Sequence, residues 1–206
     1  MSPNYALVTE QIIHKNLKED KIPSLLIHSC CAPCSSSVIE YLSRHFKITV
    51  FYFNPNITDQ KEYDMRKLEQ KKFIETFKTD MHVDFIEGNY NVKDFYSFAT
   101  PLSHHKEGGM RCFKCYQFRL EETAKKAKEG GYDYFATTLT VSPLKNAQKI
   151  NEIGRILEEQ YKVSYLYSDF KKKDGYKRSM ELSREYGLYR QNYCGCEFSK
   201  NNDNLG

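Results

Sequence analysis

Every cysteine of this 206-residue chain falls into one of three short motifs. Thiolates grouped this closely can bind a metal together or exchange electrons as a disulfide pair. The cysteines therefore predict a metal site, a redox site or both. The three motifs are Cys30-Cys31-Ala32-Pro33-Cys34, Cys112-Phe113-Lys114-Cys115 and Cys194-Gly195-Cys196.

The first two motifs can supply four sulfur ligands. Cys112 and Cys115 are expected to lie near the start of a helix that continues to Glu129, where residues three apart share one face. Cys30 and Cys31 can point the same way only at a bend after a strand. Four such thiols suit either tetrahedral zinc or a 4Fe–4S cluster, and their spacing does not separate the two.

Three thiols remain after these four. Cys34 follows Pro33, which is expected to delay the next helix, and it is either a further iron ligand or an inert buried thiol. Gly195 allows the chain to turn so that Cys194 and Cys196 face one site. A disulfide between them would close a small, strained and labile ring, which favours a redox pair. Ligation of a second iron is the alternative interpretation.

Composition narrows the class of protein. No stretch approaches the ~18 apolar residues of a membrane helix, and residues 1–21 do not resemble a secretory signal, so we expect a cytoplasmic protein. In a reducing compartment, clustered cysteines favour metal or redox chemistry over structural disulfides. The net charge of +4 permits an RNA partner without requiring one. Most Tyr and Phe are expected in the core, although such rings can also stack on unpaired bases.

Five apolar runs predict strands that alternate with helices. This alternation predicts a mostly parallel five-stranded sheet covered on both faces. Such sheets bind ligands at the carboxyl ends of their strands, and Cys30 directly follows the first run. Neither a P-loop nor a glycine-rich loop follows that run, which argues against nucleotide hydrolysis. The five runs are residues 24–28, 47–53, 82–87, 134–139 and 163–167.

Two helix starts and one domain are predicted. Asp59 with Glu62 resembles a capping box. Ser142-Pro143 has the pattern of an N-cap followed by proline at the first helical position, with apolar residues at helical spacing up to Tyr161. We expect a single domain over residues 1–206. Its core would span about 22–170, and a helical Cys-Gly-Cys segment would span about 171–199.

Five segments, in order, resemble a known family over nearly the whole chain. They are residues 25–34 (LLIHSCCAPC), 51–57 (FYFNPNI), 111–115 (RCFKC), 137–146 (TTLTVSPLKN) and 189–199 (YRQNYCGCEFS). These motifs are similar to those of the QueH-type epoxyqueuosine reductases. The cysteine motifs are specific for that family when they are taken together.

The resemblance implies a fold, an activity and partners. The fold would be a Rossmann-like three-layer α/β sandwich related to adenine-nucleotide hydrolase-like domains. The activity would be cobalamin-independent, iron–sulfur-dependent reduction of epoxyqueuosine to queuosine, the last step of queuosine biosynthesis. The substrate would be tRNA with a GUN-type anticodon, and an external electron donor would be needed. The implied residues are Cys30, Cys31, Cys112 and Cys115 for the 4Fe–4S cluster, Cys194 and Cys196 for the redox pair, and Cys34 as a candidate ligand of an additional mononuclear iron.

Loss of the epoxide oxygen as water consumes two electrons and two protons. We hypothesise that Cys194 and Cys196 relay the electrons, and that Tyr193 and His28 are candidate proton donors. The basic residues Lys171–Lys173, Lys177 and Arg178 are candidate phosphate contacts. Two other classes stay open: a thiol–disulfide oxidoreductase and a zinc-stabilised RNA-binding module without chemistry.

Overall fold

A five-stranded parallel sheet forms the centre of the protein. The structure is a computed structural model that describes residues 3–200. The strand order is β3-β2-β1-β4-β5. The chain adds β2 and β3 on one side of β1 and then crosses to the other side of β1 for β4 and β5. This topology confirms the predicted α/β class. The strands are β1 (Ser24–His28), β2 (Lys47–Tyr52), β3 (Val83–Glu87), β4 (Tyr134–Thr137) and β5 (Ser164–Tyr165).

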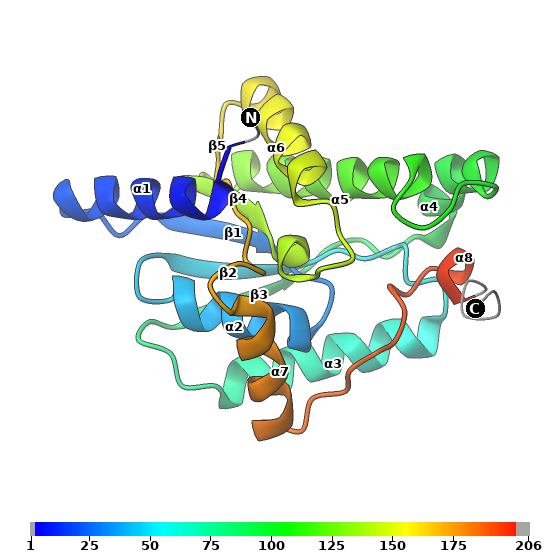
Figure 1. Cartoon of the computed structure of the whole chain (residues 1–206), viewed down its shortest axis with the longest axis horizontal. Helices are drawn as coiled ribbons and strands as arrows, with labels where there is room; N and C mark the ends of the chain where they lie inside the picture. Colours follow the sequence, from blue (N-terminus) through cyan, green and yellow to red (C-terminus); the bar gives the residue numbers. More distant parts are fainter. Residues whose placement is uncertain (1–2, 201–206) are drawn as a thin grey trace.

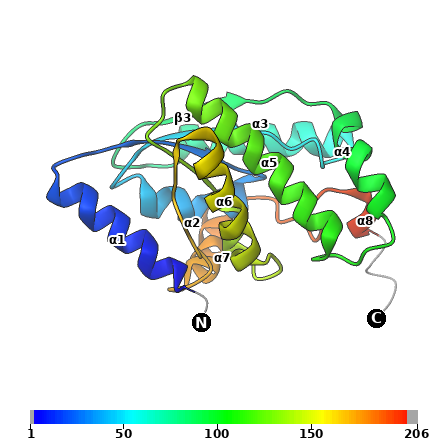
Figure 2. The same ribbon diagram turned by 90° about the horizontal axis from the view of Figure 1, so that it is seen from above.

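Helices cover both faces of this sheet (Figure 1). On one face lie α2 (Ala32–Leu42), α3 (Gln60–Thr76) and α7 (Gly175–Glu185), joined in the same core by α1 (Tyr5–Lys18). On the other face lie α5 (Met110–Glu129) and α6 (Ala147–Tyr161), which are in front of the sheet in Figure 2. Strand residues alternate between the two cores: Leu25 and Ile27 belong to the first, and Leu26 belongs to the second.

Three short elements complete the fold at one end of α5. They are α4 (Val92–Ala99), the 3₁₀ helix η1 (Thr100–Leu102) and α8 (Glu197–Lys200). Phe198 of α8 packs against Phe95 and Tyr96 of α4. This contact brings the end of the described chain next to the start of α5, as Figures 1 and 2 show.

One of the two predicted helix starts is correct. The Asp59 carboxylate accepts hydrogen bonds from the backbone N–H groups of Lys61 and Glu62, at 2.9 and 3.2 Å, and it caps α3 as expected. The prediction for Ser142-Pro143 was wrong, because α6 begins at Ala147. Its cap is Asn146, whose side chain accepts from the Lys149 N–H at 2.9 Å.

Ser142 instead follows a second 3₁₀ helix, η2 (Thr138–Val141), which ends the predicted fourth strand early at Thr137. The Ser142 hydroxyl accepts a hydrogen bond from the Leu144 N–H at 3.3 Å, so it stabilises a turn and not a helix start. This turn leads into the loop that carries Lys145.

The expectation for Pro33 was also wrong. Helix α2 begins at Ala32, immediately after Cys31, and Pro33 is its second residue. Proline fits there because the first-turn N–H groups of a helix have no partner within the helix. Cys34 consequently lies in the first turn of α2 and not in a loop.

The division into a core and a C-terminal segment stays a prediction. The two ends of the predicted domain, residues 1–2 and 201–206, lie outside the described residues. Among residues 3–200, no helix is both long and apolar enough to span a membrane.

Candidate functional site

Three thiols gather where β1 ends and α2 begins. The sulfurs of Cys30 and Cys31 are 3.7 Å apart, so the adjacent pair does point to one place, as the sequence predicted. Cys34 joins them from the first turn of α2, and the three Sγ atoms lie within 4.8 Å of one another. Among the described residues, this is the one group of three or more Cys, His, Asp or Glu ligand atoms as close as this.

The electrostatics of this group favour a thiolate. Hydrogen bonds from Cys31 and Cys34 hold the pKa of the Cys30 thiol well below its usual value. The contact with Cys30, together with burial, raises the pKa of Cys31 to about 12, although Cys34 acts in the opposite direction. The N-terminal end of α2 further favours negative charge at this position. The group therefore favours one thiolate, at Cys30, and this soft ligand suits a metal cation that prefers sulfur.

The second motif lies in the first two turns of α5. Cys112 and Cys115 are both buried, and the Gly108 N–H donates a hydrogen bond to the Cys112 sulfur at 3.3 Å. Burial raises the pKa of Cys115 to about 11. Gly108 has a φ of +81°, which lets the chain turn back over the helix start and aim this N–H at the sulfur.

The third motif belongs to an extended segment, residues 189–196, that we call the strap. In the strap, the Cys194 and Cys196 sulfurs are 3.6 Å apart, and Cys194 also lies 3.3 Å from the Ser199 hydroxyl. The contact with Cys196 lowers the pKa of Cys194, and the positive charge of Lys145 acts in the same direction. The two sulfurs of the predicted redox pair are thus brought together in this structure.

Helix α3 holds the strap in place. The Glu69 carboxylate accepts a hydrogen bond from the Tyr189 N–H at 2.6 Å. Arg66 is 1% exposed, pairs with Glu62, and reaches the Tyr193 and Cys194 carbonyls at 3.4 and 3.5 Å. A fully buried guanidinium of this kind fixes the backbone that carries Cys194.

Gly195 lets the strap approach the loop after β2. Its φ is +103°, and a Cβ at this position would lie 2.7 Å from the Ile57 side chain. Its carbonyl accepts a hydrogen bond from the Thr58 N–H at 3.1 Å. The sequence predicted a glycine-dependent turn, and the structure adds the reason that no side chain fits.

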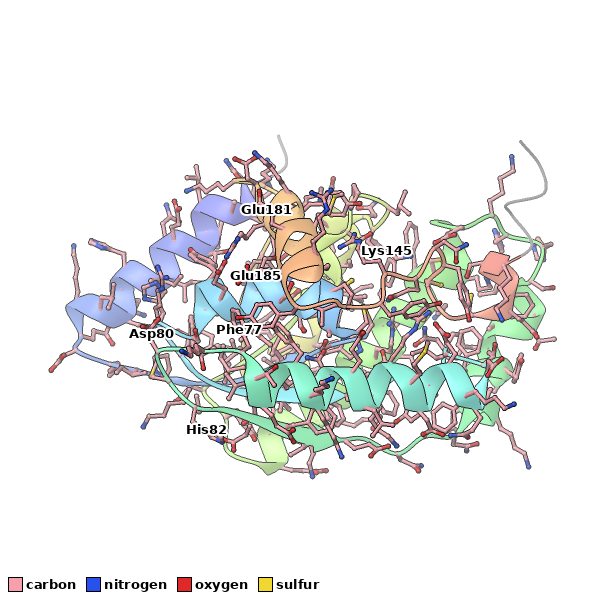
Figure 3. The ribbon with its side chains drawn as sticks, turned by 90° about the horizontal axis from the view of Figure 1, so that it is seen from below. Phe77, Asp80, His82, Lys145, Glu181 and Glu185 are labelled. Carbon is pink, nitrogen blue, oxygen red and sulfur yellow. The ribbon has the colours of Figure 1, made fainter. Side chains whose placement is uncertain are left out.

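Thiols of the first and third motifs line one cavity of about 180 Å³. Figure 3 shows Lys145, one of its lining residues, beside the strap. Its lining includes Cys30 and Cys34 of the first motif and Cys194 of the third. Cys112 packs in the same hydrophobic cluster as Cys30 and Cys31, and Cys115 packs with the Cys-Gly-Cys motif. Sulfurs from distant parts of the sequence therefore meet at one place.

This convergence is not a single tight ligand sphere. The close group includes Cys34, which the sequence analysis left outside the set of four sulfur ligands. It does not include Cys112 or Cys115. The Cys115 thiol instead has electrostatic interactions with Cys112 and Cys194.

The two candidate proton donors differ in their surroundings. His28 is fully buried, with Nδ1 3.0 Å from the Thr137 hydroxyl and Nε2 3.1 Å from the Phe53 carbonyl. Burial lowers its pKa to about 3, so the ring is neutral and joins β1 to its neighbours. Tyr193 is half-buried and lines the cavity, where it faces Arg66. Its position suits chemistry better than that of His28.

The predicted basic run is largely paired with acids. Lys171 binds Asp169, Lys173 binds Glu10, and Arg178 binds Glu40 through two nitrogens. These carboxylates offset much of the charge on which the phosphate-contact hypothesis depended.

Sequence reasoning missed the cations of the site. Arg66, Arg119 and Lys145 all line the cavity, against a single acid, Glu107. Lys145 pairs with Glu107 at 2.9 Å; burial opposes its charge, but Cys194 and Glu107 raise its pKa above the usual value. The sequence held one signal for Arg119. It lies seven residues after Cys112, and positions i and i+7 of a helix share a face.

Comparison with known proteins identifies the family. The family model described as "Epoxyqueuosine reductase QueH" matches residues 25–202, which include all three cysteine motifs. The chain belongs to the QueH family. This membership confirms the resemblance seen in the sequence.

Individual QueH proteins are similar over most of their length. Proteins named epoxyqueuosine reductase QueH from Staphylococcus epidermidis and Streptococcus pyogenes are each 44% identical to this chain; the matches cover 95% of it and 84% and 78% of those proteins. The Thermotoga maritima protein of the same name is 37% identical over 85% of this chain and 90% of its own length.

Proposed function

We propose that this protein is an epoxyqueuosine reductase that acts on the wobble nucleotide of tRNA. The observation that carries the proposal is a cation-lined cavity whose lining includes thiols of two cysteine motifs, with the third motif packed against them, in a chain of the QueH family. A cytoplasmic location and an external electron donor belong to the same proposal.

The thiols fit an iron–sulfur group. They are soft ligands, five of the seven are buried, and Cys112 already accepts a backbone N–H hydrogen bond. Thiolates of a 4Fe–4S cluster bind different irons, so they need not approach one another as the ligands of a single ion do. When bound, such a group would supply single electrons and a Lewis-acidic iron. We assign Cys30, Cys31, Cys112 and Cys115 to the cluster and Cys34 to an additional iron.

The Cys194–Cys196 pair can balance the reaction. Oxidation of this dithiol breaks two S–H bonds, forms one S–S bond and releases two electrons and two protons. Reduction of an epoxide to an alkene and water consumes the same numbers. The 3.6 Å separation of the sulfurs is short enough for small motions to close the disulfide. An external donor must then reduce it again.

Cations of the cavity can assist the loss of oxygen. Lys145, held by Glu107, can stabilise the negative charge that develops on the epoxide oxygen as the ring opens. Tyr193 is a candidate to deliver a proton to that oxygen. Both side chains face the cavity that Cys194 lines.

The mouth of the cavity suits an unpaired nucleotide. Arg190 is exposed, lies 5.7 Å from the Tyr176 ring, and has no carboxylate partner among the described residues. The neighbouring Tyr189 exposes 42% of its surface. A cation beside exposed rings can contact a phosphate while bases stack. We therefore place the tRNA contact at this mouth in preference to the paired run around Lys172.

Anaerobic purification followed by a tRNA assay tests the proposal. Iron and acid-labile sulfide are measured, and the protein is then mixed with epoxyqueuosine-containing tRNA and a chemical reductant. Mass spectrometry of the nucleosides should show a loss of one oxygen. A colourless protein with stoichiometric zinc and no change in the nucleoside would favour the zinc-stabilised RNA-binding module instead.

A further inference from the structure

Arg119 is a buried cation without a carboxylate. It lies on α5 and is 3% exposed, and its one hydrogen bond is to the Asn54 side chain at 3.5 Å. Its Nε has no hydrogen-bond partner among residues 3–200. The other two buried arginines have more partners: Arg66 pairs with Glu62, and Arg111 donates to three backbone carbonyls, although its Nε also lacks a partner among the described residues. A buried guanidinium left in this state is costly unless something else accepts its protons.

What surrounds Arg119 is sulfur. Its charge interacts with one thiol from each cysteine motif, Cys115, Cys30 and Cys194, and it lines the cavity with the latter two.

Tyr116 provides a second unpartnered donor on the same helix face. Cys112, Cys115, Tyr116 and Arg119 are spaced i, i+3, i+4 and i+7 along α5, so they form one stripe. The Tyr116 side chain is 1% exposed, and its hydroxyl has no hydrogen-bond partner within the described part of the chain. Two buried donors without acceptors thus accompany two of the proposed cluster ligands.

We propose that Arg119 and Tyr116 are positioning residues that donate hydrogen bonds to the sulfurs of the thiolate-bound iron–sulfur group and offset its negative charge. This inference rests on the cofactor assigned under the proposed function. It goes beyond that assignment by naming the residues that set how readily the group accepts an electron.

The physical reason is charge. Each electron adds one negative charge to a group that four thiolates have already made anionic. A buried cation is screened far less than one in solvent, so it stabilises the reduced form more than the oxidised form. Hydrogen bonds to the sulfurs act in the same direction.

Redox titration of the reconstituted protein tests this role. Wild type, Arg119→Gln, Arg119→Lys and Tyr116→Phe are titrated with dithionite and mediators, and the reduced form is quantified by electron paramagnetic resonance. For Arg119→Gln, the ratio of reduced to oxidised protein at a fixed potential should fall about tenfold, equivalent to about 59 mV for one electron. Arg119→Lys should retain most of the wild-type potential, and Tyr116→Phe should show a smaller decrease than Arg119→Gln.

Lys114→Gln is the matched control, because it removes one positive charge from an exposed position of the same helix. The inference is overturned if Arg119→Gln shifts the potential no more than this control does. If Arg119→Gln fails to assemble the cluster, Tyr116→Phe decides, and an unchanged potential there overturns the inference. Wild-type protein without iron would refute the proposed cofactor as well, whereas iron-loaded variants with unshifted potentials refute this inference alone.

Discussion

At the scale of single residues, Cys194 offers the sharpest test of the electron relay. Serine keeps its shape but cannot form a disulfide with Cys196, whose sulfur lies 3.6 Å away. We expect Cys194→Ser to abolish multiple turnover, with tRNA in excess and the nucleoside product followed by mass. Undiminished multiple turnover would eliminate the relay.

Iron content provides the control for this variant. Cys194 is assigned to the redox pair and not to the cluster, so Cys194→Ser should retain the wild-type amounts of iron and sulfide, whereas Cys112→Ser should lose much of both. Loss of iron from Cys194→Ser would instead support the alternative interpretation, in which the Cys-Gly-Cys motif holds a second iron.

The chemistry-bearing residues were only partly visible in the sequence. All seven cysteines could be named, because cysteines grouped so closely in a chain expected to be cytoplasmic already suggest metal or redox chemistry. Arg66 could not, because arginine is usually exposed and nothing local marks it as buried. For Arg119 the one local signal was its helical spacing from Cys112. The membership of Cys34 in the tight thiol group also depended on where α2 begins, which a rule about Pro33 misjudged.

At the scale of elements, the start of α6 supplies a stability test. Removing the Asn146 cap in Asn146→Ala should lower the free energy of unfolding by about 1 kcal/mol. Ser142→Ala is the matched variant, and it should cost less because Ser142 stabilises only a turn. Chemical denaturation measures both. A larger loss for Ser142→Ala would contradict the observed start of the helix at Ala147.

The strap can be tested through its glycine. Gly195→Ala should be strained by about 1–3 kcal/mol, because its φ is +103° and the new Cβ would meet Ile57. Gly187→Ala is the control, since Gly187 also has a positive φ, +61°, but open space around it. We measure the rate of the reductase reaction at a series of rising temperatures. Gly195→Ala should lose its activity at a lower temperature than Gly187→Ala. Equal losses would mean that the close approach to Ile57 is unimportant.

Strands and long helices were predictable because their signal is local. The apolar runs at 24–28 and 47–53 matched β1 and β2 within one residue, and the capping box found α3. The fourth and fifth runs were too long, because η2 and the turn toward α7 use the same residue types without pairing to a neighbour. The hydrophobic pattern of a sequence does not show where a strand stops pairing with its neighbour in the sheet.

At the scale of the whole molecule, tRNA binding is expected at the mouth of the cavity. Arg190→Ala should weaken binding and reduce the slope of log affinity against log salt by about one, as loss of one phosphate contact does. Arg184→Ala removes the same charge from an exposed position at the end of α7 and should leave the slope nearly unchanged. Filter binding over a salt series distinguishes the two, and equal slopes for both variants would move the contact elsewhere.

The order of the three motifs along the chain has a consequence for biogenesis. The ribosome releases Cys30 and Cys31 well before it reaches Cys196. At 5–20 residues per second, roughly 10–30 s separate these events. During that interval the first thiols lack the strap that later lines the same cavity, so they are open to oxidation. A nascent protein of this kind therefore depends on a reducing environment before it has any catalytic use for one.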